Sequence, residues 1–170
     1  MSRVKDCLVS AIGEVRSISH QLRPRELDDL GLTAAIQGAV DELRSQSGLQ
    51  VVSALARFRS RLPLELELAL YRIFQEAVTN ALKHARATRL QVTLARAAGG
   101  LKLRVEDNGH GFKPAAAGRA AAPSRSSLGL LNMRERAEFI GGTLAVSSVP
   151  SEGTTIEVWA PWPARRQPKH

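Results

Sequence analysis

The sequence has a single cysteine, few aromatic residues and no long apolar run. Cys7 cannot form an internal disulfide or a multi-cysteine metal site, and nothing else argues for an oxidising compartment. Charges or glycines interrupt the apolar stretches well before the ~18 residues that a bilayer span needs. No charged segment followed by an apolar one opens the chain as a signal peptide would. We therefore expect a cytoplasmic chain that does not enter a membrane.

The chain is strongly basic, with a formal net charge of +8. This charge has two interpretations, a solvated basic surface or a nucleic-acid partner. The basic residues are scattered, and aromatic residues make up only 4% of the chain, which leaves no stacking platform. No helix-turn-helix pattern accompanies them. The pattern favours a solvated surface without nucleic acid, and the Arg-rich tail at 163–170 is expected to be disordered.

Hydrophobic periodicity predicts four helices and five strands in a chain long enough for one domain. A polar connection is expected from Arg25 to Gly31, after Pro24 ends the first helix, and Thr33 is expected to cap the second. Glycine-rich turns join the later strands, two of which form a hairpin. The predicted helices span 3–22, 33–47, 63–84 and 128–140, and the predicted strands span 49–54, 89–95, 101–106, 143–149 and 154–159.

Strand pairs that alternate with helices are typical of an α+β fold. Most of the strands are amphipathic, so one face of the sheet is expected to be covered and the other solvated. We predict a two-layer α/β sandwich with a mixed, mostly antiparallel sheet covered on one face by helices. Between Lys113 and Ser127 the composition falls to Ala, Gly, Arg, Ser and Pro, which predicts a mobile and functional loop.

The third predicted helix carries Glu76, Asn80 and His84 four residues apart, along one edge of its apolar stripe. An Asn oxygen is a hard ligand suited to Mg²⁺, and Glu supplies charge or a general base. A hydrated helix edge would show the same spacing, so both interpretations stay open at this point.

The predicted strand at 101–106 runs directly into Asp107. Strict alternation places Asp107 on the same face as Leu103 and Val105, at the edge of the core. A buried ionised carboxylate needs hydrogen-bond donors, and the amine of an adenine would be one. The alternative is that Asp107 caps the turn that follows it.

Two glycine positions follow that strand and a third begins the last helix. Gly109 and Gly111 would allow the backbone to approach a ligand closely. Gly129 and Leu130 lie where the predicted helix begins, and helix N-termini favour phosphate. The order of these features carries more information than any one of them: a polar-edged helix, a strand that ends in Asp, a loop, and a glycine at a helix start.

This order of motifs resembles the ATP-binding domain of sensor histidine kinases, in the superfamily that also includes gyrase, the mismatch-repair ATPase and the heat-shock chaperone. The resemblance covers about residues 15 to 160. Its four motifs, in chain order, are Glu76 to Asn80 with Lys83 and His84, Asp107 to Phe112, Leu128 to Arg136, and Gly153 to Thr155.

The resemblance implies the GHKL, or Bergerat, fold with ATP and Mg²⁺ as ligands. Asp107 would receive the adenine amine, Asn80 would coordinate Mg²⁺, and Gly129 would cradle phosphates, with a lid at 113–127. Glu76 would order the magnesium and its waters, or activate water as in the ATPase relatives. The remaining nucleotide-binding residues that the resemblance implies are Lys83, His84, Gly109, Gly111, Leu130 and Thr154.

The segment from Ile18 to Leu32 is similar to the nitrate-sensor and quorum-sensor type of kinase. The resemblance then implies part of a dimerisation helix at 1–24, a linker at 25–32 and a catalytic domain at 33–162. The acceptor histidine of that type lies in a His-Asp or His-Glu pair, and no histidine of this chain precedes an acidic residue.

We therefore expect the acceptor on a partner helix of the full-length kinase, a response regulator as the next recipient, and a possible homodimer through the N-terminal helix. A regulatory module that holds nucleotide without turnover is the alternative function.

Overall fold

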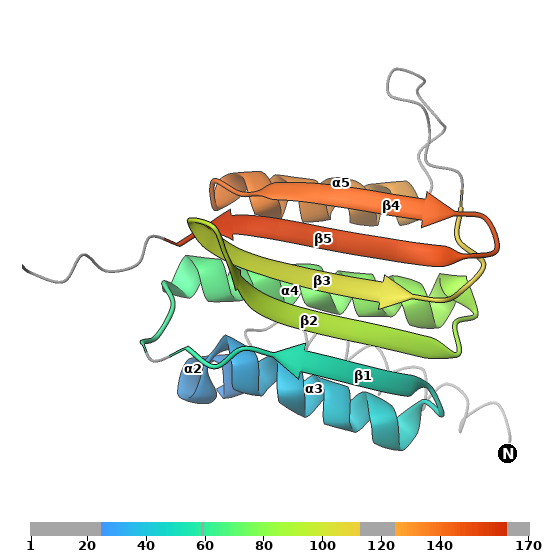
Figure 1. The fold of residues 1–170 in the computed structure, drawn as a ribbon, viewed down its shortest axis with the longest axis horizontal. Coiled ribbons are helices and arrows are strands. Elements are labelled where there is room, and N and C mark those ends of the chain that lie inside the picture. The colour runs from blue at the N-terminus through green and yellow to red at the C-terminus, as the bar shows by residue number, and fades with distance from the viewer. Residues whose placement is uncertain (1–24, 59, 113–124, 163–170) are drawn as a thin grey trace, which may run out of the picture.

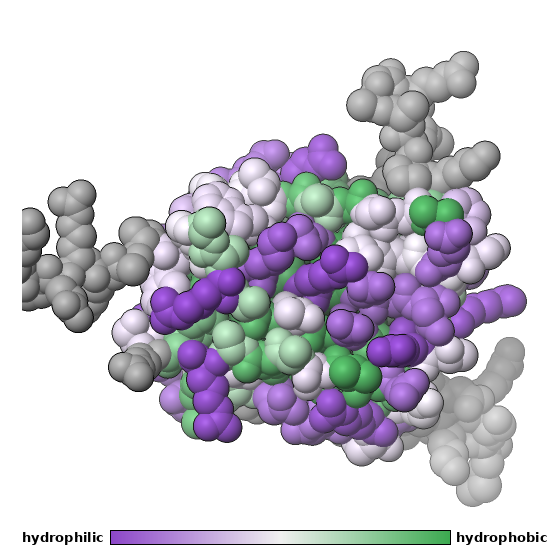
Figure 2. All heavy atoms as spheres, in the orientation of Figure 1, coloured by the Kyte–Doolittle hydropathy of each residue, from purple (hydrophilic) through white to green (hydrophobic). Residues whose placement is uncertain are grey.

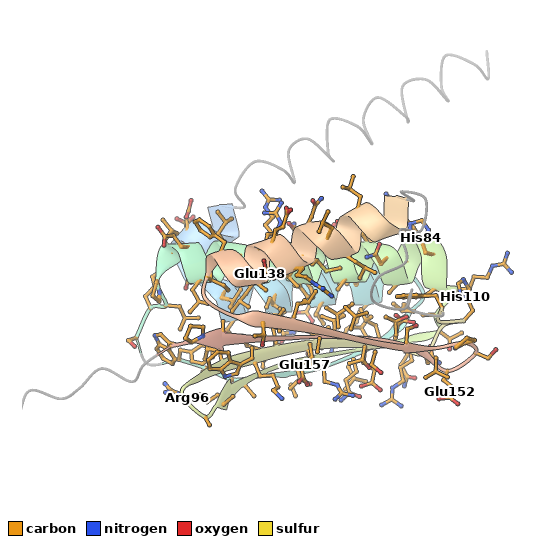
Figure 3. The ribbon with its side chains drawn as sticks, turned by 90° about the horizontal axis from the view of Figure 1, so that it is seen from above. His84, Arg96, His110, Glu138, Glu152 and Glu157 are labelled. Atoms are coloured by element: carbon orange, nitrogen blue, oxygen red, sulfur yellow. The ribbon has the colours of Figure 1, made fainter. Side chains whose placement is uncertain are left out.

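The computed structural model describes residues 25–58, 60–112 and 125–162, which form one two-layer α+β unit (Figure 1). All of the helices lie on one side of the sheet, which Figure 3 shows edge on. The fold class predicted from the sequence is thus confirmed. The helix predicted over 3–22, most of the loop at 113–127 and the basic tail lie outside the described residues.

The sheet has five strands in the order β1-β2-β3-β5-β4. β1 pairs with β2 in parallel, and every other pair is antiparallel. Every predicted strand is present, and no strand end differs from its prediction by more than two residues. The strands are β1 (Gln50–Leu55), β2 (Arg89–Ala97), β3 (Gly100–Asp107), β4 (Thr143–Val149) and β5 (Gly153–Pro161).

Four α-helices and a π-helical turn complete the described part of the chain. α4 leads directly into the π turn η1, which brings the chain from the helix back toward the sheet. The helices are α2 (Arg25–Leu30), α3 (Leu32–Gln46), α4 (Leu64–Asn80), η1 (Ala81–Ala85) and α5 (Arg125–Phe139).

The core lies between α4 and the inner face of the sheet. Leu70, Ile73 and Phe74 of α4 are at most 1% exposed, and they recur at the three- and four-residue spacing that the sequence shows. The alternate residues of β2 and β3 meet them from the sheet. Burial of these apolar side chains is the main force that holds the helix against the sheet.

The opposite face of the sheet is open to solvent. Figure 2 views this face and shows hydrophilic side chains across its centre. Lys102 forms an ion pair of 2.9 Å with Glu157 on the neighbouring strand, and Arg104 pairs at 2.7 Å with Glu106. The charges here are mixed, as expected for a solvated surface.

Three local predictions were wrong. The segment expected as a polar connection forms α2, because Leu27 is fully buried. Thr33 does not cap α3: the N-cap is Gly31, and the Thr33 hydroxyl donates to the Ala56 carbonyl at 2.9 Å. Helix α5 begins at Arg125, so residues 125–127 belong to the helix and not to the predicted lid.

No helix in the described ranges is both long enough and apolar enough to cross a membrane.

Candidate functional site

A pocket opens at the end of the sheet where β3 and α4 both end. The space in it amounts to about 560 Å³ when its open mouth is included. Apolar side chains such as Ala77, Val105 and Ile156 form its walls. Six predicted site residues line it: Asn80, His84, Asp107, Gly111, Leu130 and Thr154. Residues from four separate parts of the sequence therefore meet here, as the order of motifs predicted.

Asp107 is the buried charge of this pocket. Its side chain is only 9% exposed, and its Oδ1 accepts a hydrogen bond of 2.8 Å from the Gly109 N–H. Burial raises the pKa of Asp107 above its ordinary value, while the backbone N–H groups of Gly109 and Thr154 and the nearby His110 counteract part of that rise. The carboxylate thus caps its turn, as one interpretation predicted, and it also lines the pocket. Its pairing with an adenine amine stays a prediction.

The glycines around Asp107 serve close packing of the protein's own backbone. A Cβ on Gly109 would overlap the carbonyl of Ala85, and a Cβ on Gly111 would overlap the carbonyl of Val149. Gly111 also has a φ of +57°, a backbone conformation that favours glycine. Gly153 has a φ of +107°, and a Cβ there would overlap the Asp107 carbonyl. Of the two glycines predicted to approach a ligand, only Gly111 lines the pocket.

Asn108 fixes the base of the glycine loop, the segment at 108–112 that follows β3. Its side-chain oxygen accepts hydrogen bonds from the N–H groups of Thr88 (3.0 Å) and Arg89 (2.8 Å), and its amide donates to the Thr88 hydroxyl. These bonds tie the end of β3 to the start of β2. The loop that follows Asp107 is therefore held in place independently of any ligand.

Two histidines lie at this end of the molecule, His84 from η1 and His110 from the glycine loop (Figure 3). The π turn η1 follows α4 directly and carries His84. Turns of this kind occur often at functional sites. The His110 N–H donates to the Ala85 carbonyl at 2.8 Å, which locks the glycine loop to η1. His110 was not predicted as a site residue, and only its place between two motif glycines could have indicated it.

This pocket lies within a segment that matches a known family. Residues 65–164 match the family described as histidine kinase-, DNA gyrase B-, and HSP90-like ATPase. The chain belongs to this ATPase family. The resemblance found in the sequence motifs is therefore confirmed.

Curated relatives of this ATPase-family chain are sensor histidine kinases. The chain is 39% identical to sensor histidine kinase MctS of Rhizobium johnstonii over 98% of its own length and 35% of that protein. It is 35% identical to oxygen sensor histidine kinase NreB of Staphylococcus carnosus, over 94% of its length and 44% of that protein. The chain thus spans less than half of the length of either relative.

Solved histidine kinase structures share the fold. The histidine kinase domain of the blue-light activated kinase of Erythrobacter litoralis aligns with a TM-score of 0.59 and 23% identity, over 75% of this chain and 58% of that one. Histidine kinase AdeS of Acinetobacter baumannii aligns with a TM-score of 0.60 and 15% identity, over 92% of this chain and 79% of that one. At these identities the likeness is one of fold.

Four predicted site residues do not line the pocket of this ATPase-family domain. Gly109 packs on Ala85, and Lys83 is exposed on η1. A Cβ on Gly129 would overlap the carboxylate end of Glu76, so these two residues face each other across α4 and α5. Gly129 is the fifth residue of α5 and not part of its first turn, since the helix begins earlier than predicted.

Ser148, a buried serine on β4, was not predicted as a site residue. Its Oγ accepts the N–H of Phe112 at 2.8 Å, donates to the Gly153 carbonyl at 3.1 Å and lies 2.9 Å from the Thr154 Oγ1. The alternation that places Leu144 and Val146 on the inner side of β4 places Ser148 there too. A polar residue at an inward position was the signal that could have revealed it.

The residues present fit a magnesium nucleotide. A buried acceptor at Asp107, apolar walls for a flat base, and the amide of Asn80 lie in one cavity. An amide oxygen suits Mg²⁺, which retains most of its waters and phosphate ligands. Among the described residues no group of three His, Cys, Asp or Glu side chains could hold a metal by itself, so the ion would depend on the nucleotide's phosphates.

Proposed function

We propose that this pocket binds ATP with its adenine amine on the Asp107 carboxylate. The observation that carries the proposal is a buried carboxyl group within an apolar-walled cavity. Such a group is costly to bury unless a donor meets it. The adenine amine is a donor, and Val105 and Ile156 offer apolar surface to the ring beside it.

Asn80 holds Mg²⁺ in this proposal, together with the phosphate oxygens of ATP. The ion, when bound, neutralises phosphate charge during phosphoryl transfer. His84 lies on the same pocket wall four residues further on, where it would meet the phosphate chain. The family motifs assign three further residues to the phosphate side, Lys83, Gly129 and Leu130. They assign Glu76 to the ordering of magnesium and its waters.

The reaction is transfer of the ATP γ-phosphoryl group to a histidine that this chain does not contain. A bond forms between the histidine nitrogen and phosphorus, the bond from phosphorus to the bridging oxygen breaks, and ADP leaves. Catalysis consists mainly of positioning and of charge stabilisation. His84 and His110 line the nucleotide pocket and lack the acidic neighbour of an acceptor. A response regulator then receives the phosphoryl group.

The full-length protein is proposed to be a two-component sensor kinase. The identity to MctS and NreB over nearly the whole chain supports this assignment. The proposal places the described domain in the cytoplasm and the acceptor on a helix of the full-length kinase, with homodimerisation through the segment at 1–24. The boundaries at 25–32, 33–162 and 163–170 remain predictions.

Labelled ATP tests this function. The chain is incubated with γ-labelled ATP and Mg²⁺, alone and with the purified dimerisation hairpin of a full-length relative. We expect acid-labile label on the hairpin only, and no label when Asp107→Ala replaces the wild type. Stoichiometric acid-labile label on the chain alone would contradict an external acceptor. Binding of ATP without transfer to a competent hairpin would favour the regulatory module that holds nucleotide without turnover.

A further inference from the structure

Ser148 lies behind the pocket and does not line it. Its side chain is buried on β4, directly beside Thr154 of β5, with which it is in register. Thr154 in turn is in register with Asp107 of β3. A single row of residues across three strands therefore leads from Ser148 through Thr154 to the buried carboxylate.

The three contacts of the Ser148 hydroxyl determine where its proton lies. A serine hydroxyl has one proton and two lone pairs. The Phe112 N–H occupies one lone pair, and the Gly153 carbonyl, which can only accept, takes the proton. The contact of 2.9 Å with Thr154 is then satisfied only if the Thr154 hydroxyl donates into the remaining lone pair.

The direction of this bond decides what Thr154 offers to a ligand. Its only hydroxyl proton points away to Ser148, so its Oγ1 presents lone pairs to the pocket. Asp107 presents carboxylate oxygens beside it. Two neighbouring acceptors of this kind recognise a donor group and repel another acceptor.

We infer that Ser148 is a positioning residue that sets the preference of the pocket for adenine over guanine, by holding Thr154 as an acceptor. Adenine carries an amine at its six-position, which donates, whereas guanine carries a carbonyl there, which accepts. The inference rests on the proposed nucleotide site. It adds a residue that never touches the base but determines which base is accepted.

Ser148 also joins base recognition to the glycine loop. Phe112, whose N–H it holds, lines the pocket at the end of that loop. Substitution of Ser148 by Ala therefore removes two effects, the anchoring of Phe112 and the orientation of Thr154. Loss of the bond to Phe112 weakens the binding of all nucleotides. Loss of the Thr154 orientation changes the ratio of the affinities for ATP and GTP.

The test compares calorimetric affinities of the whole chain for magnesium complexes of non-hydrolysable ATP and GTP analogues. In Ser148→Ala the Thr154 hydroxyl is free to donate to the guanine carbonyl. We expect the preference for the ATP analogue to fall by roughly 3- to 10-fold, the range for one hydrogen bond. Ser147→Ala is the matched control, since Ser147 lies next in sequence on the exposed side of β4. It should leave the preference unchanged.

The variant Thr154→Val tests the role of the Thr154 hydroxyl without removing Ser148. The preference should fall in this variant too, and adding Ser148→Ala to it should change the ratio no further. If Ser148→Ala does not fold, Thr154→Val alone decides. An unchanged ratio in either folded single variant, even with weaker binding of both analogues, would overturn the inference while leaving the ATP site intact. Failure of the wild type to bind either analogue would overturn the proposed function and this inference with it.

Discussion

At the residue scale, Asp107 combines a costly burial with a proposed role, the binding of adenine, that would need its charge. Because burial raises its pKa, the ionised form is held at an energetic cost in the domain without ligand. A carboxyl whose pKa is raised by folding contributes stability that is full below the pKa of the unfolded state. That contribution is lost as the pH rises through the pKa of the folded state.

Asp107→Asn should therefore separate stability from binding. An Asn oxygen can still accept the Gly109 N–H but carries no charge to desolvate. We expect the variant without nucleotide to melt at or above the wild-type temperature at pH 7.5, and to bind ATP about 10-fold more weakly or worse, as for a lost charged hydrogen bond. Thermal melts and calorimetry measure the two effects. A melting temperature several degrees below the wild type would contradict the assigned cause of the pKa shift.

The pH dependence of ATP affinity follows from the same carboxylate. The adenine amine needs an ionised acceptor, so affinity falls as the pH drops through the pKa of Asp107. Because that pKa is raised, the loss should begin at a higher pH than for an ordinary Asp near 3.8. Calorimetry between pH 8 and pH 4 on folded protein measures it, with Asp107→Asn as control. A wild-type profile parallel to that of Asp107→Asn would show that another group controls binding.

At the element scale, the glycine loop is held by close backbone contacts with η1. A Cβ on Gly109 would overlap the Ala85 backbone, so Gly109→Ala must push the two elements apart. We expect a loss of about 1–3 kcal/mol in the free energy of unfolding, the usual cost of overpacking, measured by urea denaturation. Gly38→Ala on the exposed side of α3 is the matched control, because nothing lies within 4 Å of the added methyl. It should stabilise the protein by about 0.5–1 kcal/mol. Equal effects at both positions would contradict the packing role of Gly109.

The elements show what the sequence could and could not predict. Periodicity located α4 because its buried residues recur every three or four positions. It located the strands because their buried residues alternate with exposed ones. It missed α2, whose six residues carry four charges and only two leucines, one of them fully buried. It misplaced the start of α5, because Arg125, Ser126 and Ser127 continue the polar composition of the loop before them.

The site was predictable as a set of motifs, but its contacts were not. The motif order brought Asn80, His84, Asp107 and Thr154 into one pocket as expected. The sequence could not show that Gly109 packs on Ala85, that Gly129 faces Glu76, or that the Ser148 and Thr154 hydroxyls meet. These contacts depend on how separate elements approach one another, which local patterns do not encode.

At the scale of the whole molecule, a ligand that binds only the folded domain should stabilise it. ATP with Mg²⁺ at 100 times its dissociation constant is expected to add about 2.7 kcal/mol to the free energy of unfolding. Urea denaturation of the wild type with and without nucleotide measures this gain. Asp107→Ala, which lacks the acceptor, should show little of it at the same concentration. A similar gain in both proteins would indicate that nucleotide binds elsewhere.

Whether this pocket binds ATP through Asp107 is tested by calorimetric titration of a non-hydrolysable ATP analogue with Mg²⁺ into the wild type and into Asp107→Ala. We expect the wild type to bind one equivalent. The variant should lose this binding while it still shows a cooperative thermal transition. Undiminished binding by folded Asp107→Ala, or no binding by the wild type, would contradict the assignment of this pocket as the ATP site.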